Sequence, residues 1–191
     1  MKLKLSFIIV TFLAASGLYG QAPDNCVTDV ILSGYSERAF LTDPVSDSQL
    51  ELILKCGIKA PSARNLQPWK FTVVKDEATM KEAISNVAHG NILIIVSGLE
   101  SETGSTSDFD CGLAAESMFV AAHGLGLAAR IYSGPTGNIN AKKDVFQIPE
   151  GYKAVAVLRI GNADKSVDAV SAASPRKTSE EIVNYWKQAL P

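Results

Sequence analysis

A continuous apolar run near the middle of the chain restricts the possible folds more than any other feature. Residues 91–97 read NILIIVS, without the alternation of polar and apolar residues that a half-exposed strand has. Such a run is typical of a strand that is covered on both faces. The sequence therefore predicts a sheet with an interior strand at this position.

Helix and strand signals interleave along the rest of the chain. Ser46 and Gln49 form a capping box for a helix over 46–59, and Asp76 caps a helix that runs to about residue 86. Residues 109–124 have a helical pattern that is apolar on nearly every side, which predicts a central helix. Weaker signals predict strands at 71–75, 127–132 and 154–161, a polar loop at 100–107, a short helix at 138–145, and a C-terminal helix from the Thr178–Glu181 capping box to about residue 190. We expect one mixed α/β domain, with a flavodoxin-like or α/β-hydrolase-like sheet as the alternative.

Composition excludes several classes of protein. The chain has 191 residues, 47% of them hydrophobic, and a net charge of −2, so it can bury one core and is not intrinsically disordered. A pI near 5.7 gives no positive field for nucleic acid. Three cysteines and two histidines, without a CxxC or HxxxH spacing, predict no metal site.

The first twenty residues predict a secretory signal peptide. Lys2 and Lys4 precede an apolar stretch over 5–18, and small residues lead to Gly20. About 14 apolar residues are too few to span a membrane. We expect cleavage near Gly20, export to the periplasm or the medium, and a mature domain over 21–191 that is not in a membrane. Cys56 and Cys111 should then be buried free thiols, with Cys26 exposed.

Two apparent motifs are better explained without chemistry. Residues 124–129 match the dinucleotide fingerprint GxGxxA, but a helix precedes these glycines and a strand follows, which is the reverse of the required order. We therefore expect a helix end and a turn. Cys111 and His123 stand twelve residues apart on one predicted helix, about 18 Å along its axis, so they cannot form a nucleophile pair. No side chain is expected to act as a nucleophile or metal ligand.

A polar loop over 60–69 is the strongest candidate for a binding site. Its sequence, APSARNLQPW, places hydrogen-bonding side chains between two prolines that restrict the backbone. A rigid polar loop between a helix and a buried strand can bind a flat polar ligand. The alternative is a surface turn anchored by Trp69.

Four blocks of sequence, in the expected order, resemble the nitroreductase family of FMN-dependent oxidoreductases. They cover nearly all of residues 27–186. The loop reads APSARNLQPWKF over 60–71, close to the family's APSxxNxQPWxF. The other blocks are GYSERAF at 34–40, like the family's R-x-S-x-R/K element; DCGLAA at 110–115 with GLGL at 124–127, like its central helix and turn; and RKTSEEIV at 176–183, like its R-K-P-x-E-E-x-V.

The resemblance implies an α+β, nitroreductase-like fold. Its central sheet would be mixed but mostly antiparallel and flanked by helices, and two chains would intertwine as a homodimer with FMN at the interface. The ribityl phosphate would contact Ser36 and Arg38 beside Gly34 and Tyr35, joined by Arg176 and Lys177, because guanidinium groups bind a dianion by paired hydrogen bonds. From the partner chain the flavin would meet the loop residues Pro61, Ser62, Arg64, Asn65 and Gln67. Backbone N–H groups of Ser133 and Gly134 would lie near flavin N5.

The chain departs from the family pattern at Gly34, where the family has an arginine. One cationic contact to FMN is then missing, which predicts binding weaker by about 1–3 kcal/mol.

The implied activity is transfer of electrons from NAD(P)H, through the flavin, to a nitroaromatic, quinone or similar small-molecule acceptor by a ping-pong mechanism. The flavin carries the chemistry, and the protein positions it. Nicotinamide cofactors are cytosolic, so an exported enzyme would need a different donor. Two alternatives are an exported flavin-binding module without turnover, and a fold without cofactor that serves protein contacts.

Overall fold

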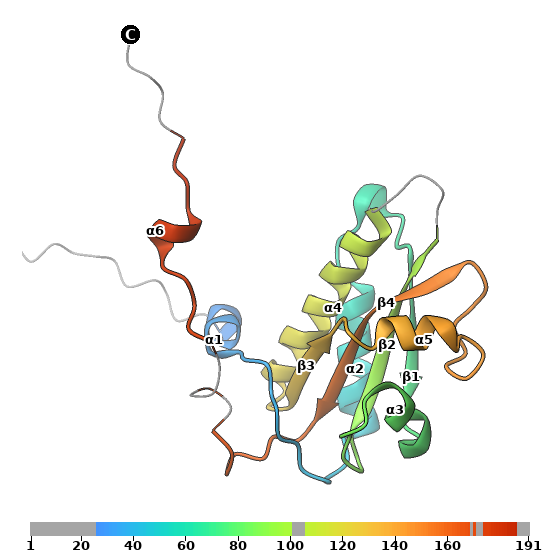
Figure 1. The fold of residues 1–191 in the computed structure, drawn as a ribbon. Coiled ribbons are helices and arrows are strands. Elements are labelled where there is room, and N and C mark those ends of the chain that lie inside the picture. The colour runs from blue at the N-terminus through green and yellow to red at the C-terminus, as the bar shows by residue number, and fades with distance from the viewer. Residues whose placement is uncertain (1–25, 101–105, 169, 171–173, 187–191) are drawn as a thin grey trace, which may run out of the picture.

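The structure is a computed structural model that describes residues 26–100, 106–168, 170 and 174–186 (Figure 1). The predicted signal peptide lies outside the described residues. The elements in chain order are helix α1 (Cys26–Ser33), α2 (Asp47–Ile58), the 3-10 turn η1 (Ala63–Asn65), strand β1 (Trp69–Val74), α3 (Glu77–Ala83), β2 (Ile92–Leu99), α4 (Thr106–Gly124), β3 (Ala128–Tyr132), α5 (Thr136–Ala141), β4 (Tyr152–Gly161) and α6 (Ser179–Ile182).

The four strands form one sheet in the order β1-β2-β4-β3, and its three strand pairs are antiparallel. β2 and β4 are therefore interior strands, while β3 is at an edge. The fold is α+β, as the resemblance implied, and the flavodoxin-like and α/β-hydrolase-like alternatives, which require parallel strands, are wrong.

Strand β2 is covered on both faces, as its apolar sequence predicts. Ile92, Ile94 and Val96 pack into a core with α2 and α4, whereas Leu93 and Ile95 pack into a second core on the opposite face. Ile53 and Met118 come to the first core from α2 and α4; Met80 and Ile139 come to the second from α3 and α5. In Figure 1, α3 and α5 lie in front of the β1–β2–β4 part of the sheet and leave β3 in view.

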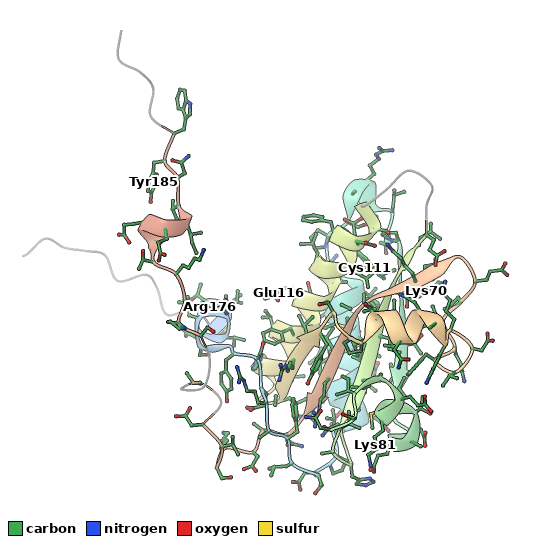
Figure 2. All side chains as sticks on the ribbon, in the orientation of Figure 1. Lys70, Lys81, Cys111, Glu116, Arg176 and Tyr185 are labelled. Atoms are coloured by element: carbon green, nitrogen blue, oxygen red, sulfur yellow. The ribbon has the colours of Figure 1, made fainter. Side chains whose placement is uncertain are left out.

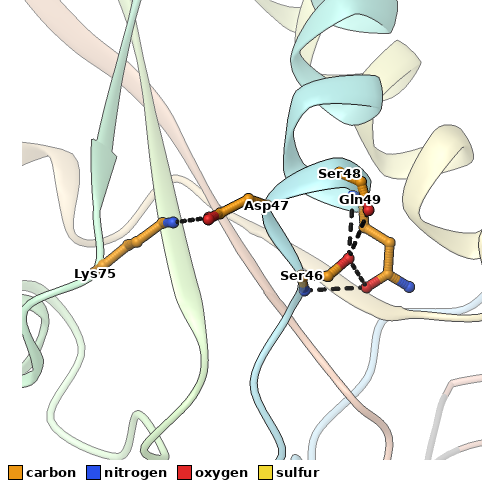
Figure 3. A network of polar contacts seen from close by, with 5 residues as sticks. All are labelled: Ser46, Asp47, Ser48, Gln49 and Lys75. Atoms are coloured by element: carbon orange, nitrogen blue, oxygen red, sulfur yellow. Dashed lines mark hydrogen bonds and ion pairs between the residues drawn. The ribbon is translucent and has the colours of Figure 1, made fainter.

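The capping box predicted at Ser46 and Gln49 is present at the start of α2. The Ser46 hydroxyl accepts from the Gln49 N–H at 3.2 Å, and the Gln49 side chain accepts from the Ser46 N–H at 3.1 Å (Figure 3). Lys75, which directly follows β1, pairs with Asp47 in the first turn. The helix therefore begins where the sequence places it.

Several predicted boundaries are wrong, each for a local reason. The predicted helix over 76–86 ends at Ala83, because Ile84 is extended and turns its side chain into the second core. The helix predicted at 138–145 covers Thr136–Ala141 instead, directly after Pro135. α4 begins within the predicted polar loop, at Thr106, and α1 was not predicted.

The predicted C-terminal helix is the largest error. Its capping box at Thr178 and Glu181 is present, but α6 ends at Ile182, and Val183 is already extended. Residues 187–191 lie outside the described part. A helix this short is not stable in isolation without a surface to pack on. The residues from Ser179 to Trp186 are all exposed, and Figure 1 shows this segment projecting away from the sheet.

The three cysteines are free thiols in different environments. Cys26 is exposed and Cys111 is buried, both as expected, while Cys56 is only half-buried. Burial, together with the negative charges of Asp108 and Asp110, raises the pKa of the Cys111 thiol to about 12. In the described ranges, no helix is long and apolar enough to cross a bilayer, and no group of three or more histidine, cysteine or acidic side chains could hold a metal ion.

These environments predict selective thiol chemistry. The thiolate is the reactive form of cysteine, so Cys111 stays unreactive at pH 8 while the protein is folded. We expect iodoacetamide to modify Cys26 and to modify Cys111 only after denaturation, as mapped by mass spectrometry of the peptides. Modification of both residues at similar rates in the folded protein would contradict the burial of Cys111, and a Cys26→Ser variant controls for the assignment.

Candidate functional site

The loop over 61–67 has the strained backbone of a ligand-binding segment. Arg64, Asn65 and Gln67 all have positive φ values, of 52°, 57° and 50°. Residues other than glycine rarely adopt this conformation, and it costs energy that the surrounding structure must supply. Three such residues within four positions make this loop the most strained described segment of the chain.

A buried carboxylate holds the loop in place. Asp110, in the first turns of α4, is 1% exposed, and both of its oxygens accept from the Ala63 N–H, at 3.1 and 3.2 Å. Two hydrogen bonds within the loop also stabilise it. The Ser62 hydroxyl accepts from the Gln67 N–H at 3.0 Å, and the Gln67 side-chain amide donates to the Asn65 carbonyl at 3.1 Å. These bonds leave the Arg64 and Asn65 side chains exposed.

A second buried carboxylate organises the segment after α1. Glu37 is 2% exposed, and one of its carboxylate oxygens accepts from the N–H groups of Arg38 and Ala39, at 2.7 and 3.1 Å. The Glu37 N–H donates to the Ala129 carbonyl of β3 at 3.2 Å. Ser36 and Arg38, on either side of the buried Glu37, are both exposed.

Tyr35 and His123 lie on the buried side of this segment. The Tyr35 side chain hydrogen-bonds to Glu37, and burial together with that carboxylate raises its pKa. Its ring centroid is 6.1 Å from that of His123, which contacts Phe119 edge-on at 4.5 Å. Burial lowers the pKa of His123, although the Tyr35 backbone and the Glu37 charge act in the opposite direction. The imidazole is therefore a packed, neutral group.

Gly34 lies where the chain leaves α1 and has little space beside it. A Cβ atom there would lie 3.0 Å from the Val30 carbonyl oxygen and 3.8 Å from the His123 ring. A side chain at this position would require the end of α1 to shift. The close approach gives a physical reason for glycine at the position of the family's arginine.

The remaining predicted site residues lie at other places. Ser133 and Gly134 follow β3 and are exposed, and the Ser133 carbonyl accepts from the Thr136 N–H at 3.2 Å at the start of α5. Arg176 and Lys177 are exposed in the segment before α6, and Figure 2 shows Arg176 on the α1 side of the molecule, far from Cys111. No described contact joins either residue to Ser36 or Arg38.

The two segments that buried carboxylates hold, the loop over 61–67 and the segment over 34–38, lie at opposite ends of α4. Asp110 anchors the loop near the N-terminus of this helix, whereas His123 meets the Tyr35–Glu37 segment at its C-terminus. Thirteen residues of helix separate these contacts by about 20 Å. One chain therefore does not bring the loop over 61–67 and the segment over 34–38 to the same point.

The arginines differ from the lysines in their ion pairing. Each ion pair among the described residues uses a lysine or a histidine as the cation. The chain has five arginines, and none of them pairs with a described carboxylate: Arg38, Arg64, Arg130, Arg159 and Arg176. Three of these residues are among the predicted ligands of a phosphate or flavin.

Sequence reasoning did not assign roles to Asp110 and Glu37. Both could have been suspected, because each is an acidic residue where the pattern predicts burial: Asp110 stands between Phe109 and Cys111 in an apolar helix, and Glu37 between two predicted ligands. A buried carboxylate must be hydrogen-bonded, and backbone N–H groups are the nearest donors. Which N–H groups it finds depends on the tertiary structure.

The anchoring of the loop by Asp110 can be tested directly. Asp110→Ala removes a charged acceptor and leaves the Ala63 N–H unsatisfied, so we expect the free energy of unfolding to fall by about 1.5–3 kcal/mol. Trypsin should then cleave the folded protein after Arg64 faster than it cleaves the wild type. Asp110→Asn, which keeps one acceptor oxygen, should lie between the two, and the exposed Asp144→Ala should behave as the wild type. Unchanged cleavage after Arg64 in Asp110→Ala would refute the anchoring role.

The chain is similar in sequence to known proteins over the segments that form this candidate site. The sequence model of the Nitroreductase family matches residues 31–106, which include both the segment over 34–38 and the loop over 61–67. A protein of Archaeoglobus fulgidus, provisionally named an NADH dehydrogenase/NAD(P)H nitroreductase, is 29% identical over 69% of this chain and 82% of its own length.

Solved structures have the same fold. The crystal structure of a protein of Bacteroides thetaiotaomicron with the same provisional name superposes with a TM-score of 0.71 at 25% identity, over 85% of this chain and 98% of the other. A nitroreductase of Bacteroides fragilis, crystallised with bound FMN, gives a TM-score of 0.71 at 21% identity over 86% of this chain and the whole of the other. The sequence model, the relatives in sequence and the structural neighbours all point to one family, and the chain is similar to the nitroreductase family both in sequence and in fold.

Proposed function

We propose that this protein is an FMN-dependent oxidoreductase that uses NAD(P)H, or a donor of similar chemistry, to reduce a small nitroaromatic, quinone or similar acceptor. The observation that carries the proposal is the exposure of Arg38 and Ser36 on the segment whose backbone the Glu37 carboxylate holds. An exposed guanidinium can bind an anion, and it matches phosphate geometry.

The described residues fit FMN at both of its ends. Ser36 and Arg38 offer a hydroxyl and a guanidinium on one exposed side of the segment that Glu37 holds. The loop over 61–67 offers exposed polar side chains on a rigid backbone, which suits a flat ring with polar edges. Relatives named for NADH or NAD(P)H, and structural neighbours that hold FMN, support the same cofactors here.

In this proposal the protein binds and orients, and the cofactor supplies the redox chemistry. When bound, FMN accepts a hydride equivalent from the donor and gives electrons to the acceptor, so donor and acceptor use the site in turn. Arg38 and Ser36 would hold the phosphate, and the exposed residues Ser133 and Gly134, which follow β3, would lie beside the ring. None of these residues has to act as a nucleophile.

The same geometry favours a homodimer. The loop over 61–67 and the segment over 34–38 lie at opposite ends of α4, so a second copy is needed to bring one loop beside the other chain's phosphate-binding segment. The outer face of α4 is exposed at Phe109, which is 68% accessible. Tyr185 and Trp186, in the segment that projects from the sheet, are 78% and 83% accessible (Figure 2). In this proposal the second copy covers these exposed side chains.

The cofactor proposal is tested by titration with FMN, followed by NADH under anaerobic conditions. We expect quenching of FMN fluorescence on binding, and loss of the flavin absorbance when NADH is added. Arg38→Gln should weaken FMN binding by about 10- to 100-fold, because it removes a hydrogen bond to a charged group. The matched control Lys81→Gln, on the exposed surface of α3, should bind FMN like the wild type (Figure 2).

Two other results of this titration would change the proposal. Bound flavin that NADH does not bleach would replace the NAD(P)H proposal with another donor or with a binding module that lacks turnover. Absence of FMN binding by the wild-type protein would refute the proposed function.

The dimer proposal is tested at Gly112, on the exposed face of α4. A Cβ atom at Gly112 would meet nothing within 4 Å in its own chain, so a large side chain there does not disturb the fold of one copy. We expect the wild type to be a dimer by light scattering, and Gly112→Trp to be a folded monomer with weakened FMN binding.

A matched control exists at Gly137 in α5. This glycine also has open space around its Cβ position but lies on the opposite side of the sheet. Gly137→Trp should remain a dimer. A monomeric wild-type protein, or a dimer that tolerates Gly112→Trp, would contradict the proposed interface.

A further inference from the structure

Arg130 stands on the open face of the edge strand β3, beside the segment that carries Ser36 and Arg38. Ala129 and Ile131 pack toward α4, so the alternation along β3 turns Arg130 and Tyr132 to the other face. Consistent with this, the Arg130 guanidinium lies 4.8 Å from the centroid of the Tyr132 ring. Figure 1 shows that α3 and α5 leave this part of the sheet in view, and Arg130 is half-exposed.

The segment over 36–40 runs beside β3 and the end of β4. The Glu37 N–H donates to the Ala129 carbonyl, and the Glu37 side chain lies on the α4 side with Tyr35 and His123. Ser36 and Arg38 are exposed next to this contact with β3, and the Phe40 ring centroid lies 4.0 Å from the Arg159 guanidinium. Arg130 is the register partner of Arg159 across β3 and β4.

Two arginines directly opposite each other on a sheet are an unfavourable arrangement without an anion. Like charges in this cross-strand position repel. Arg159 is 2% exposed, and its described hydrogen bonds go to neutral groups, with Asn91 accepting from Nε at 2.7 Å. Arg130 has no described carboxylate partner. The Glu37 carboxylate lies in the adjacent segment, but no described ion pair joins a carboxylate to Arg130 or Arg159.

The same region lacks the arginine that the family pattern places at position 34. Gly34 cannot gain a side chain without movement of the end of α1, since a Cβ atom would lie 3.0 Å from the Val30 oxygen. We propose that Arg130 supplies the missing guanidinium and binds the phosphate of FMN together with Ser36 and Arg38. This inference rests on the proposed function. It assigns phosphate binding to a residue of the sheet, in addition to the residues of the segment after α1.

The test compares FMN with riboflavin, which has the same ring without the phosphate. For Arg130→Gln in the full chain we expect FMN affinity to fall by about 10- to 100-fold while riboflavin affinity is unchanged. Arg130→Lys should recover part of the FMN affinity, because it keeps the charge but loses the paired hydrogen bonds. Lys81→Gln serves again as the control.

Thermal melting gives a second readout that does not depend on activity. Arg130→Gln removes the repulsion from Arg159 and also the contact with the Tyr132 ring, so without flavin it should melt close to the wild-type temperature. The rise in Tm on adding FMN should be smaller than in the wild type. A merely structural role for Arg130 would instead lower the Tm of the flavin-free variant.

The outcomes separate this inference from the proposed function. Unchanged FMN affinity in Arg130→Gln, or an equal loss of FMN and riboflavin affinity, would overturn the assignment of Arg130 to the phosphate while the cofactor proposal stands. Failure of the wild-type protein to bind FMN would refute both.

Discussion

The burial of β2 on both faces is the constraint on which the rest of the structure depends. Every residue of this strand except Leu99 is buried, so helices have to cover both sides of the sheet. α2 and α4 cover one side, and α3 and α5 cover the other over β1, β2 and part of β4. That leaves β3 at the edge with one open face. The segment that carries Ser36 and Arg38 lies beside this edge, which the chain's own helices leave uncovered.

Two buried carboxylates hold the backbone of the predicted site segments. Glu37 and Asp110 are the two most buried carboxylates described, and both accept hydrogen bonds from backbone N–H groups of predicted site segments. A buried carboxylate is strongly unfavourable unless it is bonded in this way, so each one holds its segment in a single conformation. The Glu37 carboxylate holds the backbone of Arg38, whose side chain is exposed.

The sequence was a good guide where local patterns decide the structure. The β2 run, the capping box at Ser46, and the helix-to-strand order around Gly126 all agree with the structure, because each depends on neighbours within a few residues. Prediction failed where distant contacts decide. The end of α3 depends on Ile84 finding a core, and the C-terminal segment ends its helix because no described surface covers it.

The candidate site could likewise be predicted only in part. The loop over 61–67 was recognisable from its prolines and polar residues, but its three positive φ values depend on an anchor 47 residues away, at Asp110. The contact of Glu37 with Ala129 spans an even longer stretch of chain. Nothing in the sequence marks Arg130 as a site residue, because a single arginine in a strand is ordinary. Its position opposite Arg159 exists only once β3 and β4 are paired.

The composition of α4 connects these observations to assembly. A helix that is apolar on nearly every side is expected to be surrounded, yet one chain buries only the face toward α2 and the sheet and leaves Phe109 exposed. The two candidate site segments also lie about 20 Å apart along this helix. The proposed second copy, packed on the outer face of α4, would account for both features. In that arrangement the apolar character of the helix and the division of the site between its two ends would have the same physical origin.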